Sequence, residues 1–190
     1  MIETIISNNC VGGAVCHELG MEFKTPTINL QILPQQFLKF CSNLRYYMDL
    51  YVVECKSFTP YEEAMLKKMF GGIPDMPIGL IDDILVCFQH YETFSEACAK
   101  WHERSQKIDY DHIGYIFHAR GPEYGKEALE FIREGLPNSL VITEGFELPG
   151  SIPLYPKEGD NAFSAVNGKL LITQAADFKT WRKLGWLPLA

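Results

Sequence analysis

The sequence predicts one α/β domain, in which a mostly parallel sheet carries helices on both of its faces. Strand-like and helix-like segments alternate along most of the chain, at the spacing of strand–helix–strand crossovers. Residues 84–88 are apolar throughout, which is typical of a strand covered on both faces. The chain has 190 residues, 47% hydrophobic and 22% charged, and shows neither an internal repeat nor a low-complexity linker. These features suit a single globular domain over residues 1–190.

In the first half of the chain, strands are predicted at residues 4–6, 27–32 and 50–55, and helices at residues 12–19, 34–48 and 60–70. Pro34 suits the first position of a helix, and apolar residues then recur at helical spacing as far as Met48. Thr59 and Glu62 form a capping-box pattern that begins the next helix.

The second half follows a loop rich in Gly and Pro at residues 71–83. Strands are predicted at residues 84–88, 113–118, 139–143 and 169–173, and helices at residues 123–134 and 177–184. Thr93 and Glu96 begin a further helix through a second capping-box pattern. Residues 144–160, rich in Pro and Gly, are expected to form an ordered, loop-rich excursion.

The charge balance narrows the classes of partner. With 17 basic and 24 acidic side chains, the formal net charge of -7 weighs against general binding to nucleic acids or anionic membranes. A local basic pocket for a phosphate stays open. No apolar stretch approaches the roughly 18–20 residues that span a bilayer, so no transmembrane segment is expected. The N-terminus lacks the pattern of a secretory signal, which favours a cytoplasmic protein. The oligomeric state is left open.

The cysteines do not predict a structural site. Their scattered spacing contains no C-x-x-C pair, so neither a disulfide framework nor a zinc site is expected. Cys10 is a weak candidate for a catalytic nucleophile, because a helix N-terminus lowers the pKa of a thiol. His17 would be its base, but it follows one to two helical turns later and would have to reach back.

The loop after the first predicted strand is the main candidate for ligand binding, through Ser7, Asn8, Asn9, Gly12 and Gly13. Free N–H groups at the start of a helix attract phosphate or carboxylate, and adjacent glycines allow the backbone to approach a ligand closely. The loop matches neither a dinucleotide fingerprint nor a P-loop. A purely structural alternative is equally open, in which the asparagines satisfy a turn and Gly12 allows tight packing.

Two further groups flank the apolar strand at residues 84–88. Asp82 and Asp83 precede it and are weak candidates for binding Mg²⁺ or Mn²⁺, with Asp83 also a candidate catalytic residue. Their side chains could share one ion only if the chain turns there, because adjacent strand residues point to opposite faces. His90 follows the strand and is the best candidate for a general base. Tyr91 beside it is a candidate for binding substrate.

Other polar residues have weaker support. Arg104 is a candidate for binding an anionic substrate, although a solvated helix face is the favoured explanation for it and for Lys100. His118 and Arg120 end another predicted strand and could face the same cleft.

An ordered series of motifs resembles a bacterial family of a domain of unknown function that is often labelled exopolysaccharide biosynthesis protein. The matching segments are residues 5–13, 19–20, 25–27, 77–79, 82–84, 88–91 and 100–104. The resemblance covers residues 3–118. It implies a compact α/β fold and a role in capsule, exopolysaccharide or lipooligosaccharide assembly, while the family's catalytic activity is not established. The family commonly has an aromatic residue where this chain has Val11, and a second arginine where it has Lys107.

The residues and the resemblance together favour a transferase that acts on an activated sugar. In this hypothesis the loop at residues 7–13 holds a phosphate, Asp83 assists through a divalent cation or a sugar hydroxyl, and His90 activates an acceptor hydroxyl. The expected partner is a sugar nucleotide, a sugar phosphate or a glycan. Two alternatives are a non-catalytic glycan- or phosphate-binding accessory protein, and a thiol-dependent acyltransferase or hydrolase that uses Cys10.

Overall fold

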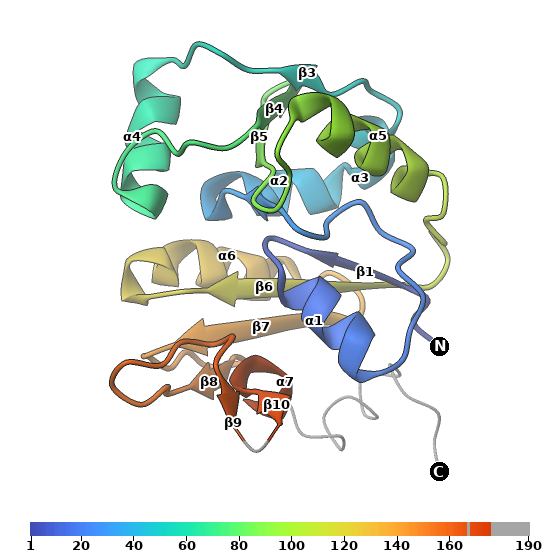
Figure 1. The fold of residues 1–190 in the computed structure, drawn as a ribbon. Helices are drawn as coiled ribbons and strands as arrows, with labels where there is room; N and C mark the ends of the chain where they lie inside the picture. The colour runs from blue at the N-terminus through green and yellow to red at the C-terminus, as the bar shows by residue number, and fades with distance from the viewer. Residues whose placement is uncertain (167, 176–190) are drawn as a thin grey trace.

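Two four-stranded sheets, one parallel and one antiparallel, form the frame of the described part of the protein (Figure 1). The structure is a computed structural model that describes residues 1–166 and 168–175. The helix predicted at residues 177–184 lies outside the described residues. Within them, no helix is both long enough and apolar enough to cross a membrane.

The parallel sheet has the strand order β1-β6-β7-β8. It consists of β1 (Thr4–Ser7), β6 (Ile113–Ala119), β7 (Ser139–Glu144) and β8 (Ile152–Leu154). All three neighbouring pairs are parallel, with Ile5 opposite Gly114 and Ile116 opposite Leu140. The carboxyl ends of β1, β6 and β7 therefore lie along one edge of the sheet.

The second sheet corrects the prediction of a mostly parallel architecture. It has the order β2-β5-β4-β3 and consists of β2 (Gln31–Ile32), β5 (Ile84–Cys87), β4 (Ile78–Ile81) and β3 (Val53–Glu54), all antiparallel. Asp82 and Asp83 join β4 to β5, and a turn of two residues can connect only antiparallel strands. The four residues of β5 are indeed buried, but their apolar run did not reveal the direction of pairing.

The helices occupy most of the predicted places. They are α1 (Val11–Glu18), α2 (Pro34–Ser42), α3 (Leu44–Met48), α4 (Pro60–Phe70), α5 (Phe94–Ser105), α6 (Gly125–Glu134) and α7 (Leu171–Ala175), with the short 3-10 helix η1 (Pro122–Tyr124) before α6. The capping box of α4 is confirmed. The Thr59 hydroxyl accepts from the Glu62 N–H, and the Glu62 carboxylate accepts from the Thr59 N–H at 2.7 Å.

Several predicted boundaries differ. The helix predicted over residues 34–48 breaks at Asn43, whose backbone angles are not helical (φ -126, ψ 32). The strand predicted over residues 27–32 shrinks to β2, because the Thr27 hydroxyl accepts from the Ser7 N–H and holds this segment without a sheet ladder. The strand predicted over residues 50–55 shrinks to β3. The excursion at residues 144–160 contains β8. The strand predicted over residues 169–173 becomes β10 (Lys169–Leu170), which pairs with β9 (Ala165–Val166), followed by α7.

Side chains of the parallel sheet alternate between two apolar clusters. Phe117 of β6 packs in the cluster that includes Phe131 of α6 and residues of α2. Its neighbour Ile116 belongs to a second cluster with Val15 of α1 and a residue of α7. Because successive strand residues point to opposite faces, α1 and α6 leave the adjacent strands β1 and β6 on opposite sides of the sheet.

Helix α2 links the two sheets (Figure 1). It contacts β6 of the parallel sheet and β5 of the antiparallel sheet. The Phe37 ring centre lies 5.9 Å from that of Phe117 and 5.5 Å from that of Phe131. Phe40, one turn later, lies 6.4 Å from Trp101 of α5. The apolar core thus continues from one sheet to the other through the aromatic side chains of Phe117, Phe37, Phe40 and Trp101.

Candidate functional site

Open α/β sheets bind their ligands at the carboxyl ends of the strands, so the carboxyl edge of the parallel sheet is a candidate site. The chain leaves β1 through residues 8–10 into α1, and it leaves β6 through Arg120 into η1 and α6. Adjacent strands whose helices depart on opposite faces leave a crevice between their connections, where open α/β sheets bind ligands.

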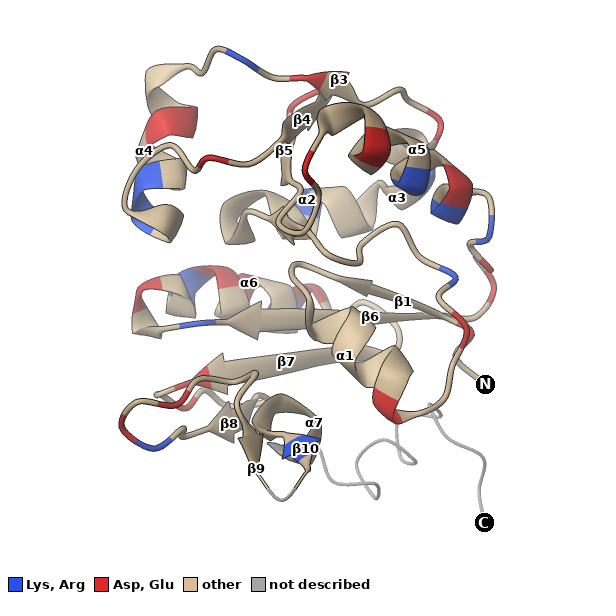
Figure 2. Cartoon of the chain, in the orientation of Figure 1, with Lys and Arg blue, Asp and Glu red and all other residues tan. Residues whose placement is uncertain are grey.

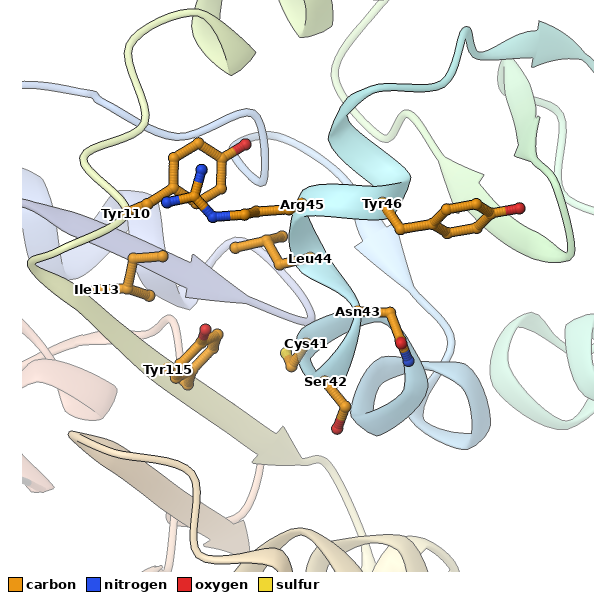
Figure 3. A pocket seen from close by; sticks show the side chains of 9 residues that line it. All are labelled: Cys41, Ser42, Asn43, Leu44, Arg45, Tyr46, Tyr110, Ile113 and Tyr115. Atoms are coloured by element: carbon orange, nitrogen blue, oxygen red, sulfur yellow. The ribbon is translucent and has the colours of Figure 1, made fainter.

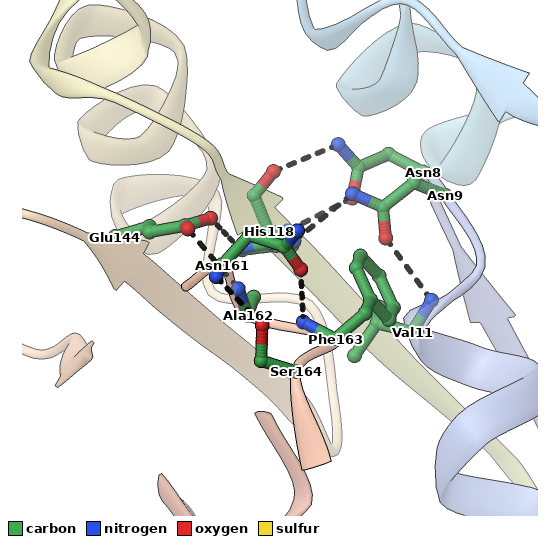
Figure 4. A network of polar contacts seen from close by, with 9 residues as sticks. All are labelled: Asn8, Asn9, Val11, His118, Glu144, Asn161, Ala162, Phe163 and Ser164. Atoms are coloured by element: carbon green, nitrogen blue, oxygen red, sulfur yellow. Dashed lines mark hydrogen bonds and ion pairs between the residues drawn. The ribbon is translucent and has the colours of Figure 1, made fainter. Parts of the chain in front are cut away.

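Asn8 clamps the ends of β1 and β6 together. Its side-chain amide donates to the His118 carbonyl at 3.1 Å and accepts from the His118 N–H at 2.8 Å (Figure 4). The side chain thereby extends the hydrogen-bond ladder between β1 and β6 beyond the last paired backbone residues. Asn8 is fully buried, and both polar atoms of its side chain take part in these two bonds.

Asn9 determines the tautomer of His118. The Val11 N–H donates to Asn9 Oδ1 at 3.1 Å, so the NH₂ group of Asn9 faces the other way, 3.0 Å from His118 Nδ1 (Figure 4). An NH₂ group can only donate, and Nδ1 must therefore accept. Neutral His118 consequently carries its proton on Nε2.

That proton faces the Glu144 carboxylate at the end of β7. Glu144 Oε2 lies 3.2 Å from His118 Nε2, a close charge contact that falls short of an aligned hydrogen bond. Burial lowers the pKa of His118, against the raising effect of Glu144. Burial raises the pKa of Glu144, but the His118 contact and the Ala162 N–H outweigh it, and the net pKa is lowered. Neutral His118 beside ionised Glu144 is thus the stable pair.

This arrangement leaves His118 without a role in proton exchange with a ligand. The ring is 0% exposed, Asn9 donates to Nδ1, and Nε2 faces only the Glu144 carboxylate. Protonation of Nδ1 would place an N–H against the NH₂ group of Asn9. His118 therefore positions the ends of β1, β6 and β7 relative to one another.

The rest of the predicted loop is closed onto itself. Ser7 Oγ donates to the Asn9 carbonyl at 2.7 Å and accepts from the Gly12 N–H at 3.1 Å. A Cβ atom at Gly12 would collide with Ser7 Oγ, whereas one at Gly13 would meet only the Ile28 side chain at 3.3 Å. The first two N–H groups of α1 are thus taken by Asn9 and Ser7, which favours the structural interpretation of these side chains.

Cys10 is half-buried at the same edge. Its thiol donates to Gln89 Oε1 at 3.4 Å. Burial raises the pKa of Cys10, although the charge of Arg120 opposes that effect. His17 is exposed near the other end of α1, seven residues further along, so the structure does not bring this predicted pair together.

His90, Tyr91 and Arg104 lie near the end of β5. His90 is exposed and directly follows Gln89, the residue that contacts Cys10. Tyr91 and Arg104 are brought together, because Arg104 Nη1 donates to the Tyr91 hydroxyl at 2.9 Å and to the Ile28 carbonyl at 3.5 Å. This contact joins α5 to the segment before β2.

Asp82 and Asp83 lie at the opposite end of β5, in the β4–β5 turn. The chain does turn there, as a shared ion would require, and Asp82 has a φ of 53°. Asp82 accepts from the Tyr46 hydroxyl at 2.9 Å, and Asp83 accepts from the Tyr47 hydroxyl at 2.9 Å. An ion pair with Lys39 lowers the pKa of Asp83. In residues 1–166 and 168–175, no group of three or more His, Cys, Asp or Glu side chains could hold a metal ion.

Two residues of this edge were not prominent among the site residues predicted from the sequence: Arg120 was a weaker candidate, and Glu144 was not a candidate. Arg120 is exposed, and the described residues offer its guanidinium no hydrogen bond or ion pair, while its charge reaches Cys10, His118 and Glu144. Glu144 was overlooked. A detectable signal was its place in a strand, because it is the one Lys, Arg, Asp or Glu among the four strands of the parallel sheet (Figure 2).

A separate cavity of about 410 Å³, here termed the Tyr–Arg pocket, opens at the amino end of β6 (Figure 3). It lies between the α2–α3 segment and the start of this strand. Its lining consists of Cys41, Ser42, Asn43, Leu44, Arg45, Tyr46, Tyr110, Ile113 and Tyr115. None of these residues was predicted from the sequence to belong to a functional site.

Comparisons with known proteins place the chain in a family. An uncharacterized protein of Haemophilus influenzae is 27% identical over 186 residues, an alignment that covers 94% of this chain and 82% of that protein. Residues 2–143, more than half of the chain, match a family described as a domain of unknown function. This range includes Asn8, His118 and Arg120 and ends one residue before Glu144. The chain therefore belongs to the domain-of-unknown-function family DUF1919.

Proposed function

We propose that the protein is a transferase that uses an activated sugar in bacterial exopolysaccharide, capsule or lipooligosaccharide assembly. The observation that carries the proposal is Arg120, an exposed guanidinium without a hydrogen-bonding partner among the described residues, at the carboxyl edge between β1 and β6. A guanidinium binds phosphate oxygens through two parallel hydrogen bonds. An activated sugar carries such a group in its phosphate or diphosphate.

The surroundings of Arg120 support a rigid site for this group. The Asn8–His118 clamp holds the β1 end against the β6 end, and the contact of Glu144 with His118 holds the β7 end against the β6 end. A ligand that binds between these ends meets groups that cannot rearrange without breaking buried hydrogen bonds. Such preorganisation favours binding, because little conformational entropy is lost on association.

The reaction requires a group that accepts a proton. The acceptor hydroxyl oxygen bonds to the anomeric carbon, the bond from that carbon to the phosphate oxygen breaks, and the phosphate-bearing group leaves. We assign the proton of the hydroxyl to His90, which is exposed beside Gln89 and near Cys10. Asp83 lies at the far end of β5, so any binding of Mg²⁺ or Mn²⁺ there belongs to a separate location.

Thermal shifts of the full chain test the binding step. The panel contains nucleotides, nucleotide sugars and sugar phosphates at millimolar concentration, each with and without Mg²⁺ or Mn²⁺. A ligand at 100 times its Kd stabilises the fold by about 2.7 kcal/mol. We expect a phosphate-bearing sugar to raise the melting temperature of the wild type and of Arg133→Ala by more than that of Arg120→Ala.

Arg133 is the matched control, since it is an exposed arginine in the last turn of α6, which leads back to the opposite edge of the sheet. A panel in which no ligand raises the melting temperature would contradict the proposal, as would a shift that Arg120→Ala retains in full. A metal-dependent shift that disappears in Asp83→Asn would assign the cation to the β4–β5 turn.

A non-catalytic accessory protein is the second candidate. The observation that favours it is the burial of His118. The fold holds this histidine rigidly at the carboxyl edge, but because it is buried it cannot exchange a proton with a ligand. An accessory protein would bind the same ligands through Arg120 without releasing nucleoside diphosphate from a nucleotide sugar. Release that His90→Ala abolishes, with unchanged ligand affinity, would favour the transferase.

The thiol-dependent acyltransferase or hydrolase has less support. A raised pKa keeps Cys10 protonated at neutral pH, whereas a nucleophilic cysteine acts as its thiolate. Cys10→Ser tests this alternative directly. Full function in that variant would exclude the thiol-dependent alternative. Loss of function in the variant, together with protection of the wild-type Cys10 from alkylation by substrate, would support it.

A further inference from the structure

The Tyr–Arg pocket carries an inference that goes beyond the proposed transferase site. It opens at the amino end of β6, where Ile113 and Tyr115 lie, whereas Arg120 follows the carboxyl end of the same strand. Tyr115 belongs to the face of β6 that packs toward α2, while His118 points to the other face. The pocket is thus separated from the carboxyl edge by the length and the thickness of the sheet.

Arg45 is the one cation of the pocket lining. Its guanidinium carbon lies 4.0 Å from the centre of the Tyr110 ring, and Figure 3 shows the Arg45 side chain extending to that ring. Within the described part of the chain, the guanidinium has no hydrogen bond or ion pair. Stacking restrains the plane of a guanidinium while its N–H edges stay free to donate. A planar, restrained fork of donors matches the oxygens of a carboxylate or a phosphate.

Hydroxyl groups complete the donor set. Among the described residues, no hydrogen-bond partner is found for the hydroxyls of Tyr110, Tyr115 or Ser42. Burial raises the pKa of Tyr115 to about 12, and burial also raises that of Tyr110 against the opposing charge of Arg45. Both phenols therefore stay protonated at neutral pH and available as donors. The Tyr46 hydroxyl is occupied by Asp82, and Figure 3 shows its ring directed away from Tyr110.

The charged residues in and around the pocket have opposite effects on an anion: Arg45 in the lining attracts it, and Asp49 nearby repels it. The lining contains no Asp or Glu side chain. Asp49, at the end of α3, is a carboxylate near enough to influence Tyr110, and it acts in the sense opposite to Arg45. Removal of the Asp49 charge should therefore strengthen the binding of an anion.

We propose that the Tyr–Arg pocket binds a small organic ligand through its phosphate or carboxylate group. The anion pairs with Arg45 and accepts from the phenols, while the rest of the ligand occupies the remaining volume of the cavity. A cavity of about 410 Å³ has room for such a molecule, in the usual range for ligand sites. The proposal requires neither the ligand nor the chemistry assigned to Arg120.

Calorimetric titration of the full chain tests it with three probes of similar size: glucose 1-phosphate, glucuronate and glucose. Both anions should bind more tightly than the neutral sugar. Arg45→Gln should weaken binding of both anions about tenfold or more, and Tyr115→Phe by a smaller factor. Asp49→Asn should tighten it. The preferred anion, phosphate or carboxylate, identifies the headgroup.

The variants also separate the two sites. Arg120→Ala should leave binding at the Tyr–Arg pocket unchanged, and Arg133→Gln controls for the loss of an exposed arginine. Arg45 is exposed, so Arg45→Gln should keep the wild-type melting temperature, which verifies its folding. Wild-type affinity in Arg45→Gln, equal affinity for glucose and glucose 1-phosphate, or no binding of any probe at millimolar concentration would overturn the proposal.

Discussion

The polar network around His118 and the Tyr–Arg pocket use similar side chains in opposite ways. In the network, Asn8 and Asn9 are buried, and their side-chain amides form hydrogen bonds with other parts of the chain. In the pocket, Arg45 and Tyr115 lie against apolar side chains, and their polar groups have no hydrogen-bond partner among the described residues. A polar side chain that the fold has already satisfied stabilises the fold, and one left unsatisfied beside a cavity is available to a ligand.

The largest expected effect is that of removing the clamp. Asn8→Ala deletes the partner of the His118 N–H and of the His118 carbonyl, and both backbone groups stay buried. We expect the free energy of unfolding to fall by about 2–4 kcal/mol in urea titrations. Asn43→Ala is the matched control at the pocket, where an exposed amide donates to the Lys39 carbonyl, and it should lose less than about 1 kcal/mol. Equal losses would break the contrast between the two regions.

The adjacent glycines of the loop give the next largest contrast. Gly12→Ala places a methyl group against Ser7 Oγ and should reduce the free energy of unfolding by about 1–3 kcal/mol. Gly13→Ala meets only the Ile28 side chain at 3.3 Å and gains helix propensity, so its effect should lie within about 1 kcal/mol of zero. Urea titration of both variants is the measurement. A large loss in Gly13→Ala instead would show that the packing of α1 depends on a different residue.

The pH dependence of stability sharpens the description of the network. Burial lowers the pKa of His118 in the folded state, so the unfolded chain binds this proton more readily. The stabilisation is complete above pH about 6.5 and is lost as the pH falls below that value toward the lower folded pKa. In urea titrations from pH 5 to 8, the free energy of unfolding of the wild type should rise with pH, and this rise should be smaller in His118→Gln.

His102→Gln is the control for that experiment, because His102 is exposed on α5 and lies outside the network. It should keep the wild-type slope. Stability that rises as the pH falls from 7 to 5 would mean that His118 gains a proton on folding, contrary to the hydrogen bond from Asn9.

The smallest effects are expected beside the pocket, at the β4–β5 turn. Tyr47 is buried and donates to Asp83, so Tyr47→Phe should cost about 1–2 kcal/mol. Tyr46 is exposed and donates to Asp82, and Tyr46→Phe should cost less than about 0.5 kcal/mol. Thermal unfolding of the two variants compares them. A larger loss in Tyr46→Phe would show that the turn is held from its exposed side.

Local chemistry was sufficient to predict most helices and three of the four strands of the parallel sheet, β1, β6 and β7, whereas β8 was expected to be part of a loop. Capping by Thr59, proline at position 34 and apolar spacing act within one or two turns of helix, so the chain near each residue contains the whole cause. The loop after β1 was identified for the same reason. The contacts of its asparagines were not, because the partners of Asn8 and Asn9 lie 110 and 109 residues further along the chain.

The direction of strand pairing and the availability of each polar side chain depended on the tertiary structure. The apolar run of β5 is consistent with either direction, and the two-residue turn at Asp82 and Asp83 decides it. Cys10, His118, Arg120 and Glu144 come together only because β1, β6 and β7 end at one edge. The sequence by itself determined the local elements and the α/β class, because those depend on neighbours along the chain. Which polar groups are satisfied and which remain free depends on contacts between distant segments, and only the folded chain establishes them.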